Sequence, residues 1–302
     1  MRAFLPGIYP RSEALVQATR DLDRARTTKD VVDELVAQDF QELVRLQEEA
    51  GLDLLADGLL TWQDLFRPLV EASAGLTARP LVRFLDTNTF YRGVLVDAEP
   101  KLQRPLPAPE LPAGRWLATL PSPYSFSRAA EREVSAEALA ADVLAPQIEA
   151  YSEAGCALVV LAEPLLTREA SGLPALLAAL AELPRPVPVA VFLPFGDAAP
   201  LLPELAEAGL GGIGVDFYAT AVDAVPEGLE TTLLAGVVDA RSSSVEDATE
   251  LAEFAGRLVD RVAGEVVLVP NGDLQFVSEP VARSKVLALG RARTASAKEA
   301  VA

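Results

Sequence analysis

The second half of the chain repeats one pattern, in which a short apolar run is followed by a loop and then by a longer helical segment. The runs are rich in Val, Ile and Leu throughout, which suits strands buried on both faces of a parallel sheet. This alternation predicts an α/β fold. The predicted strands are residues 158–161, 187–193, 212–217, 233–238 and 265–269, and the predicted helices are residues 173–183, 198–208, 245–262 and 279–292.

The first half continues the alternation less regularly. Residues 4–8 and 54–57 are predicted strands on either side of a long helix over residues 30–50, which Gly51 should end, and residues 116–120 form a third strand. Together with the later five strands this gives about eight strand–helix units, the number in a TIM (β/α)8 barrel. The alternative is an open, doubly wound sheet, because closure of a sheet leaves no mark in a sequence. We expect one domain over residues 1–302.

One stretch departs from the repeat and predicts a β-hairpin. Residues 81–84 and 90–96 are strand-like, and the polar residues 86–89 form the turn between them. We expect this hairpin to be inserted between the second and third barrel units. It is followed by a Pro-rich segment, residues 100–112, which predicts an extended connector, and residues 295–302 predict a frayed tail.

The chain has no histidine and only one cysteine, Cys156. Zinc sites in proteins draw their ligands mainly from Cys and His, so only carboxylates remain to hold a metal, and we predict no metal site. Proton transfer through histidine is excluded as well. A general acid or base must therefore be Asp, Glu, Tyr, Lys or Cys. Cys156 follows Gly155 in a predicted helix-to-strand turn, where we expect a structural role.

The formal net charge of −18 indicates which partners the protein avoids. Such a charge repels both a nucleic-acid backbone and an anionic membrane surface. The longest apolar stretch, residues 173–183, is too short to cross a bilayer and contains Glu182. The amino-terminal residues lack the apolar run of a secretory signal. We therefore expect a cytoplasmic protein with a small-molecule ligand, and neither nucleic acid nor membrane as a partner.

In a TIM barrel the active site lies at the carboxyl ends of the strands, so the residues that follow each strand are the candidates for chemistry. Asp or Asn just after a strand often has a purely structural role as a helix cap or turn former, and this is the alternative interpretation of Asp197, Asp239 and Asp273. A capping or turn-forming role is a weaker alternative for Glu163, which stands before Pro164 after a fully apolar strand. The candidates are Tyr9, Arg11, Asp57, Gln63, Asp64, Tyr124, Ser125, Glu163, Phe195, Asp197, Asp216, Asp239, Arg241, Asn271 and Asp273.

The order of these strand ends resembles one known family, the C-terminal catalytic domain of cobalamin-independent methionine synthase. The similarity covers most of the chain and implies a TIM barrel. The segments that carry it are residues 7–11 (GIYPR), 47–53 (QEEAGLD), 57–58 with 63–64 (DG and QD), 84–88 (FLDTN), 162–164 with 172–174 (AEP and GLP), 238–242 (VDARS) and 270–274 (PNGDL).

The resemblance also implies which residues should bind zinc and homocysteine, and most are replaced. The family's His-x-Cys ligands fall on Phe192 and Pro194, its glutamate ligand on Asp216 and its last cysteine on Gly272. Its general-acid histidine falls on Arg241. The homocysteine-binding serine, glutamate and aspartate fall on Ile8, Leu59 and Ala162. The resemblance therefore implies loss of zinc-dependent homocysteine activation. The residues predict no cofactor, and only the resemblance suggests folate as one.

Three functions compete. The first is a methyltransferase that presents its nucleophile in another way. The second is a metal-free enzyme similar to uroporphyrinogen decarboxylase, in which Arg11 and Arg241 hold an acidic substrate and Asp216 or Tyr124 donates a proton. The third is a non-catalytic binding or regulatory protein, with or without a protein partner that supplies missing groups; the oligomeric state cannot be inferred.

Two sets of residues carry these hypotheses. The candidate catalytic residues are Asp216, Glu163, Arg241 and Tyr124. The candidate substrate pocket consists of Ile8, Tyr9, Arg11, Leu59, Gln63, Asp64, Ala162, Phe192, Pro194, Asp239 and Asn271. Because Ile8, Leu59, Ala162, Phe192 and Pro194 are apolar, we expect the pocket to accept an apolar part of its ligand.

Overall fold

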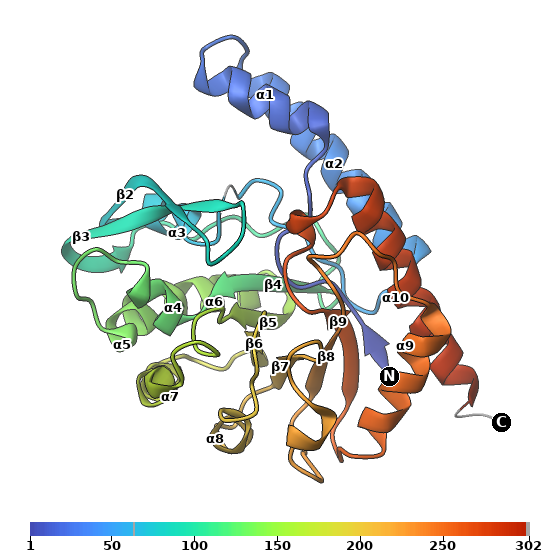
Figure 1. Ribbon diagram of the computed structural model, residues 1–302. Coiled ribbons are helices and arrows are strands. Elements are labelled where there is room, and N and C mark those ends of the chain that lie inside the picture. The colour runs from blue at the N-terminus through green and yellow to red at the C-terminus, as the bar shows by residue number, and fades with distance from the viewer. Residues whose placement is uncertain (63, 300–302) are drawn as a thin grey trace.

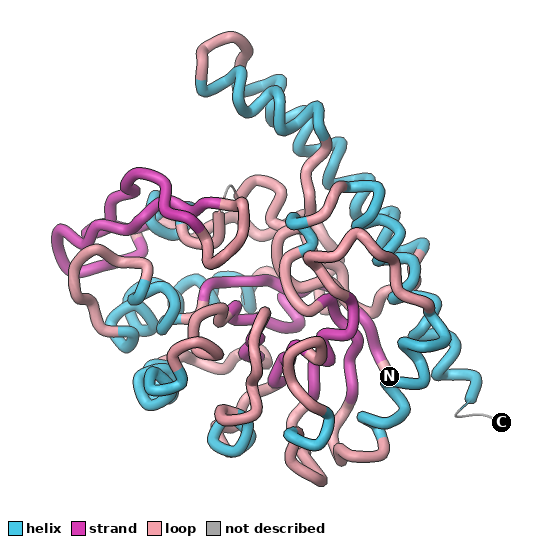
Figure 2. Tube along the Cα trace, viewed as in Figure 1, coloured by secondary structure: helices cyan, strands magenta, loops and turns pink. Residues whose placement is uncertain are grey.

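Seven strands form one curled parallel sheet at the centre of the protein (Figures 1 and 2). The structure is a computed structural model that describes residues 1–62 and 64–299. The predicted α/β class and parallel sheet are confirmed. In the order in which they pair, the strands are β1 (Arg2–Ala3), β9 (Val266–Pro270), β8 (Leu233–Val238), β7 (Gly212–Asp216), β6 (Val189–Leu193), β5 (Cys156–Ala162) and β4 (Trp116–Pro121).

The strand order decides against the doubly wound alternative. From β4 to β9 each strand pairs with the next one along the chain, and β1 pairs with β9. A doubly wound sheet needs a point at which this order reverses, and this sheet has none within the described residues. Because all pairs are parallel, the carboxyl ends of the strands lie at one edge, which we call the mouth.

A short segment lies between the two edge strands of the sheet. The Asp53 N–H donates to the Ala3 carbonyl at 2.9 Å, and Leu55 forms a parallel bridge with Trp116. The predicted strand over residues 54–57 is nevertheless reduced to this single bridge. One reason is that the Gln47 side chain bonds to both the N–H and the carbonyl of Ala56, at 2.8 and 2.9 Å, so these groups do not pair with a strand.

Helices cover the outside of the sheet, with α4 to α8 along one part of the curve and α9 and α10 along another (Figure 1). Helix α2 ends at Glu49, close to the predicted end, and is followed by Gly51 with a φ of +69°. The helices are α1 (Glu13–Asp23), α2 (Lys29–Glu49), α3 (Arg67–Ala72), α4 (Pro123–Arg128), α5 (Ala136–Leu139), α6 (Ala145–Glu153), α7 (Leu173–Ala181), α8 (Leu202–Ala206), α9 (Ala248–Val259) and α10 (Glu279–Glu299), with a π-helical turn at Ala140–Leu144 and 3₁₀ turns at Ala170–Gly172, Val222–Ala224 and Leu274–Phe276.

Several predicted boundaries were wrong for identifiable reasons. The first strand is Arg2–Ala3 and not residues 4–8, because Pro6 has no N–H to donate and Gly7 turns the chain at a φ of +87°. Helix α8 is much shorter than residues 198–208 and begins only after Pro200, with Pro203 in its first turn, where proline is tolerated. Residues 295–299, predicted as a frayed tail, continue α10, and residues 300–302 lie outside the described part.

The predicted hairpin forms a separate antiparallel sheet of two strands, β2 (Ser73–Arg83) and β3 (Phe90–Leu102), beside the parallel one. Both strands are longer than predicted, so the Pro-rich connector begins only after Leu102. The Asp64 carboxylate attaches β3 to the preceding loop, because it accepts hydrogen bonds from the N–H groups of Phe66, Arg67 and Arg92 at 2.8 to 3.0 Å.

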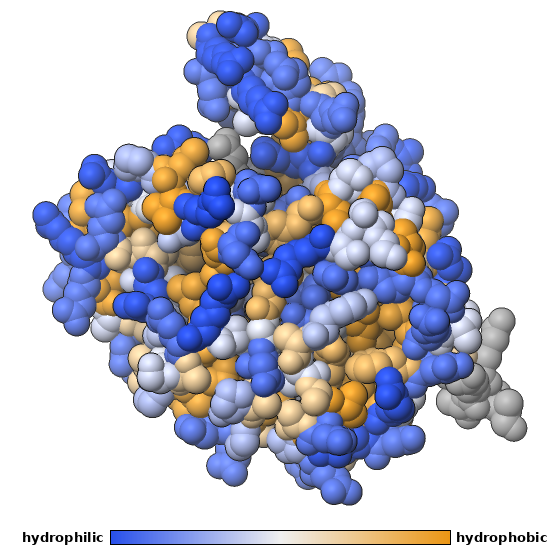
Figure 3. Space-filling view, viewed as in Figure 1, coloured by the Kyte–Doolittle hydropathy of each residue, from blue (hydrophilic) through white to orange (hydrophobic). Residues whose placement is uncertain are grey.

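The core has two parts, one between the sheet and the helices and one inside the curl. On the face shown in Figure 3, hydrophilic residues cover most of projecting α1, while apolar patches lie over the body. No helix of the described residues is long and apolar enough to span a membrane. The inner part consists of Phe4, Leu54, Ala56, Leu117, Leu158, Val160, Ala190, Phe192, Leu234, Val267 and Val269.

Candidate functional site

Side chains fill most of the mouth. The cavity at its centre holds about 20 Å³, which is room for roughly one water molecule. Three residues of the predicted pocket, Ala162, Phe192 and Pro194, line this cavity, together with Phe84 and Phe195. Ligand sites usually measure about 300 to 1,000 Å³, so the mouth as it stands has no room for a substrate.

The Phe195 ring occupies the space over Gly272. A Cβ atom at Gly272 would lie less than 3.0 Å from three atoms of this ring. Phe195 has a φ of +59°, a conformation that bulky residues rarely adopt and that costs energy unless neighbouring contacts hold it. Those contacts are the Arg241 guanidinium, 4.5 Å from the ring centroid, and the Phe276 ring, 5.4 Å away.

The Phe192 side chain fills the interior of the curl below the mouth. It is 4% exposed and belongs to the inner part of the core. Its ring packs against Gly214 on the neighbouring strand β7, where an added Cβ would lie less than 3.0 Å from three ring atoms. The Phe192 ring on β6 therefore fits here because position 214 on β7 is a glycine.

The tip of the hairpin lies over the mouth and is held there by two arginines. The Asp86 carboxylate lies 3.1 Å from Arg168, in the loop after β5, and 3.6 Å from Arg241, in the loop after β8. A hydrogen bond to its own backbone, and then these two charges, lower the pKa of Asp86. The Phe84 ring stacks on Phe276 with centroids 6.4 Å apart. The hairpin thus closes the mouth from above.

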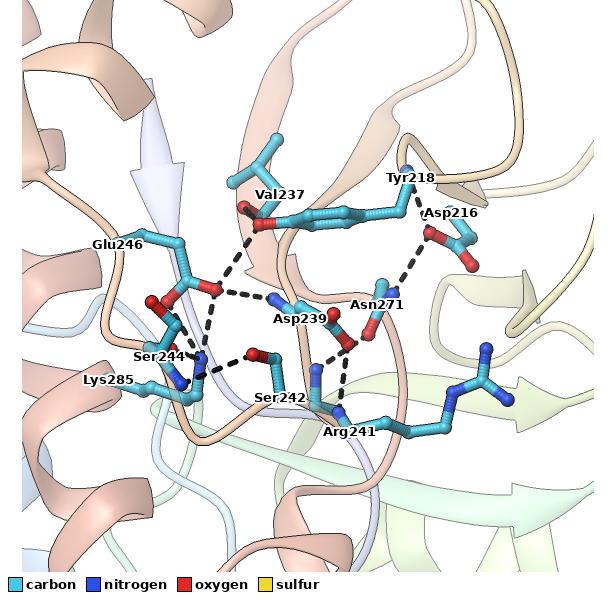
Figure 4. Close-up of polar contacts among 11 residues, drawn as sticks. Asp216, Tyr218, Val237, Asp239, Arg241, Ser242, Ser244, Glu246, Asn271 and Lys285 are labelled. Atoms are coloured by element: carbon cyan, nitrogen blue, oxygen red, sulfur yellow. Dashed lines mark hydrogen bonds and ion pairs between the residues drawn. The ribbon is translucent and has the colours of Figure 1, made fainter. Parts of the chain in front are cut away.

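Asp216 and Asn271 join the ends of three strands (Figure 4). The Asp216 Oδ1 accepts hydrogen bonds from Asn271 Nδ2 at 3.0 Å and from the Tyr218 N–H at 2.9 Å, and the Asn271 Oδ1 accepts from the Ala240 N–H at 2.8 Å. Burial raises the pKa of Asp216, and the Asn271 hydrogen bond opposes that rise. The second Asp216 oxygen points away from this network (Figure 4).

Asp239 belongs to the same edge and contacts residues of its own loop. The Asp239 carboxylate accepts the Arg241 N–H at 2.9 Å, as expected for a turn-forming aspartate. The Asp239 N–H donates to Glu246 at 2.8 Å. Glu246 also forms an ion pair with Lys285, at 2.9 Å, and accepts the Tyr218 hydroxyl at 3.2 Å (Figure 4).

Sequence reasoning missed this ion pair. Lys285 is fully buried, and Glu246 is 12% exposed. The pair lies beside a groove of about 560 Å³ between α9 and the loops after β7 and β8, outside the curl. The available signal was the position of Lys285, which falls on the apolar face of α10 three residues after buried Ala282 and four before buried Leu289.

Glu163 is buried and fully hydrogen-bonded, an arrangement that favours a structural role over the predicted catalytic one. Its Oε1 accepts from the Ser125 hydroxyl at 2.6 Å and from the N–H groups of Leu165 and Leu166 at 3.0 and 2.9 Å. Its Oε2 accepts from the Ser122 hydroxyl and from the Ser125 N–H. Burial raises the pKa of Glu163, and these bonds oppose the rise. The carboxylate fastens α4 to the loop after β5.

The remaining candidate catalytic residue, Tyr124, contacts the segment between β5 and α7. Its hydroxyl donates to Glu169 at 3.0 Å, and its ring covers Gly172 at the start of α7. Burial, and then the Glu169 hydrogen bond, raise the pKa of Tyr124 to about 12. Tyr124 therefore keeps its proton at neutral pH. It does not line the cavity at the centre of the mouth.

The other predicted pocket residues are divided between several places. Tyr9 and Arg11 line a separate cavity near the starts of α1 and α10. Ile8 and Leu59 are buried at 6% and 4% exposure, and neither lines the cavity at the centre of the mouth. Gln63 lies outside the described residues.

Cys156 is the buried first residue of β5, and its thiol donates to the Leu158 carbonyl at 3.1 Å. Burial raises its pKa to about 11. The thiol is therefore neutral at physiological pH, which suits the structural role predicted for it.

Comparison with known proteins bears on the fold. No protein-family model and no curated protein matches the chain. A B12-independent methionine synthase from Shewanella sp. W3-18-1, solved in complex with selenomethionine, aligns over 91% of this chain and 92% of its own, at 16% identity and a TM-score of 0.73. A putative vitamin-B12 independent methionine synthase from Listeria monocytogenes aligns over 98% and 97%, at 15% identity and a TM-score of 0.67.

This chain has the fold of these B12-independent methionine synthases. The resemblance predicted from the sequence is thus confirmed at the level of the fold. The four positions that the sequence resemblance assigned to zinc ligands lie at the ends of β6, β7 and β9. They are Phe192, Pro194, Asp216 and Gly272.

Proposed function

We propose that the chain is a methionine synthase-like TIM barrel forming one domain over residues 1–302. In this proposal residues 53–57 act as the second strand, and the hairpin β2–β3 is inserted between the second and third units. Two observations support it. Hydrogen bonds connect this segment to both β1 and β4, and Leu54 and Ala56 contribute to the core inside the curl.

We further propose that this barrel has lost the zinc and homocysteine site and serves to bind a different small molecule. Side chains with nitrogen, sulfur or carboxylate ligands must surround a zinc ion. Phe192 and Pro194 have no such atom, Gly272 has no side chain, and Asp216 uses one oxygen for Asn271 and Tyr218. No three Asp, Glu or Cys side chains of the described residues could together hold a metal ion. These residues do not fit zinc.

The observation that carries this proposal is the contact between Phe195 and Gly272. The ring occupies the place in which a ligating side chain at position 272 would lie. The positions matched to the homocysteine contacts, Ile8, Leu59 and Ala162, are apolar as well. An amino-acid zwitterion there would lose its hydration and gain no polar partner.

The decarboxylase-like alternative has less support. It requires Arg11, Arg241, Asp216 and Tyr124 to converge on one substrate, but Arg11 lines a different cavity and Tyr124 bonds to Glu169. We favour binding over catalysis for the same reason, since the candidate acids and bases either form structural hydrogen bonds or lie apart. A cytoplasmic location and the exclusion of nucleic acid remain predictions from the sequence.

Metal analysis together with a methyl-transfer assay tests the proposal. The protein is purified from zinc-supplemented medium, and its zinc content is measured by mass spectrometry. Methionine formation is then assayed with homocysteine and methyl-tetrahydrofolate. We expect substoichiometric zinc and no methionine. One zinc per chain, or methionine formation by the isolated protein, would overturn the proposal.

A further inference from the structure

The tip of the hairpin, residues 84–90, divides the mouth into two small cavities. The cavity at the centre and a second one beside β3 each hold about 20 Å³. Three side chains, those of Leu65, Phe84 and Asp273, line both cavities. Side chains that border two cavities form the wall between them, and of these three only Phe84 belongs to the tip. Moving Phe84 away would therefore join the two cavities.

The tip is a turn held together by its own hydrogen bonds. The Phe84 N–H donates to the Thr89 carbonyl at 3.0 Å, and the Phe84 carbonyl accepts from the Thr87 N–H and hydroxyl at 3.1 and 2.6 Å. Within the described residues, no hydrogen bond joins the backbone of residues 84–89 to a segment outside the hairpin. The middle of β3 differs, since the Val94 N–H donates to the Ala129 carbonyl at 3.2 Å. The tip can therefore move while the base of the hairpin stays attached.

The polar contacts between the tip and the barrel are two exposed ion pairs. The Asp86 side chain is 63% exposed, and those of Arg168 and Arg241 are 43% and 41% exposed. Water screens such pairs, so they add little to stability. Leu85 has a φ of +51°, which costs energy for a side chain of its size. A small free energy therefore holds the tip in its closed position.

The two arginines converge on Asp86 from the loops after β5 and β8. Within the described residues, Asp86 is the only carboxylate that lies within 4.0 Å of either guanidinium. The Arg241 charge also opposes the rise in the pKa of Asp216, from beyond that distance. Two guanidinium groups that meet one carboxylate form an anion-binding site, and the protein's own Asp86 occupies it.

The tip presents a second group to the barrel, which is the Phe84 ring. This ring stacks on Phe276, with centroids 6.4 Å apart and planes inclined by 10°. Phe276 in turn contacts the Phe195 ring at 5.4 Å. The tip thus places a carboxylate on two arginines and an aromatic ring on a pair of phenylalanines. A small molecule that carries the same two groups would match both contacts.

We propose that the tip is a lid that an aromatic carboxylic acid displaces from the mouth. The ligand carboxylate replaces Asp86 between Arg168 and Arg241, and the ligand ring replaces Phe84 against Phe276. The lid is then released, and the two cavities become one. The inference rests on the proposed function, because it takes the mouth as the place where the small molecule binds, and it names the chemical class of that molecule.

Other ligand classes fit the same contacts less well. A cationic ligand would meet two arginines of its own sign. An uncharged ligand would offer these arginines no charge in exchange for Asp86, so the closed lid would be favoured over the open one.

Calorimetry with simple arylalkanoic acids tests the inference. Phenylacetate, 3-phenylpropanoate and 4-phenylbutanoate differ in the spacing between ring and carboxylate, and each is compared with its own neutral amide. We expect saturable binding of at least one acid. Its amide should bind about tenfold more weakly, because it lacks the charge that the arginines hold.

Removal of Asp86 should strengthen binding, because the internal competitor is lost. Asp86→Asn should bind the acid about two- to fivefold more tightly than the wild type, which is the competition that an exposed ion pair can exert. Asp97→Asn is the matched control. It removes the same charge from the same hairpin, at a residue bonded to Thr77, and should leave the affinity unchanged.

Arginine variants locate the site. Arg168→Met, made in the Asp86→Asn protein so that the lid tether is already absent, should weaken the acid about tenfold. Arg79→Met in the same protein is the matched control, since Arg79 forms an exposed pair with Glu131 at 3.4 Å, and it should leave binding unchanged. Circular dichroism checks that each variant is folded.

Hydrogen exchange distinguishes a displaced lid from a ligand bound beneath a closed one. A ligand that packs under the tip slows exchange there, whereas a ligand that displaces the tip speeds it. With saturating acid, we expect faster exchange at residues 84–90 and unchanged exchange at Val94.

Any of four results would overturn the inference. They are the absence of saturable binding of all three acids to both wild type and Asp86→Asn, equal binding of acid and amide, an affinity that responds to neither Asp86→Asn nor Arg168→Met, and slower exchange at residues 84–90 in the saturated protein. None of these results depends on zinc content or methyl transfer. Failure of this inference is therefore distinguishable from failure of the proposed function.

Discussion

The Asp86 carboxylate lies 3.1 Å from the Arg168 guanidinium and so joins the tip of the hairpin to the loop after β5. The Arg241 guanidinium, 3.6 Å from the same carboxylate, extends the contact to the loop after β8. These loops follow strands that are separated in the sheet by β6 and β7. The exposed Asp86 carboxylate therefore links the loop after β5 to the loop after β8.

We predict that Asp86→Asn loosens the tip without unfolding the protein. The pair is exposed, so its loss should hardly change overall stability, but the tip loses its charged tether. Hydrogen exchange should become faster at residues 84–90 and stay unchanged in β5. Asp97→Asn, in the same hairpin but bonded to Thr77, is the control. Equal exchange in the wild type and in Asp86→Asn would contradict the prediction.

The same tether should depend on pH in the acidic range. Because the folded-state pKa of Asp86 is lowered, the charged contact is present above the ordinary Asp value of about 3.9 and is lost as pH falls through the lower folded value. The difference in exchange between wild type and Asp86→Asn should therefore vanish in strong acid. A difference that persisted there would show that charge is not its cause.

A side chain at position 272 should destabilise the protein. Gly272→Ala places a methyl group against the Phe195 ring, and overpacking of this kind costs about 1 to 3 kcal/mol. Gly256→Ala is the matched control, because nothing lies within 4 Å of its added methyl group in the middle of α9, and it should stabilise by up to about 1 kcal/mol. Urea unfolding measures both.

Measuring the effect of Gly272→Ala in the Phe195→Ala protein separates the steric clash from other effects of the alanine. In Phe195→Ala the ring is absent, so Gly272→Ala should cost little there. An equal cost of Gly272→Ala with and without the ring would show that Phe195 does not occupy this space. The double-mutant cycle isolates the pair, provided that each single variant folds.

The sequence predicted those parts of the fold whose signals are local. The apolar run 233–238 reappears as β8, and the polar turn at residues 86–89 separates β2 from β3. The short first strand and the single bridge at Leu55 were not predictable, because they depend on pairing with β9 and β4. Those partners lie far along the chain, and the Gln47 side chain takes up the N–H and carbonyl of the neighbouring Ala56.

The site was predicted less well, because its side chains are arranged by distant contacts. Glu163 was identified from its place before Pro164, but Ser122 and Ser125, which saturate it, come from the end of another strand. The position of Phe195 depends on a positive φ and on Arg241 and Phe276. No pattern near residue 195 reports these contacts.

Lys285 and Glu246 should be strongly coupled. In Lys285→Met, the Glu246 carboxylate loses its cation although it is only 12% exposed. This loss should destabilise the protein by about 3 kcal/mol. Lys29→Met, the same change in an exposed pair with Asp33, should cost less than about 1 kcal/mol. Adding Glu246→Gln to Lys285→Met should recover part of the loss. Equal costs for the two lysines in urea unfolding would contradict the burial argument.

The buried thiol of Cys156 should make the protein less stable in alkali. In the unfolded chain the thiol ionises near its ordinary pKa of about 9, whereas burial raises the folded pKa to about 11. Between these values the folded state holds a proton that the unfolded state has lost. The free energy of unfolding contributed by this group is therefore complete below pH 9 and is lost as pH rises through 11.

Comparison with Cys156→Ala isolates this effect from the tyrosines and lysines that also titrate in alkali. Wild type should lose about 2 kcal/mol more than Cys156→Ala between pH 9 and pH 11, which is most of the roughly 2.7 kcal/mol that a shift of about two pKa units represents. Urea unfolding at several pH values measures the difference. Parallel stability curves for the two proteins would mean that the thiol is as free to ionise in the folded state as in the unfolded one, and that β5 does not bury it.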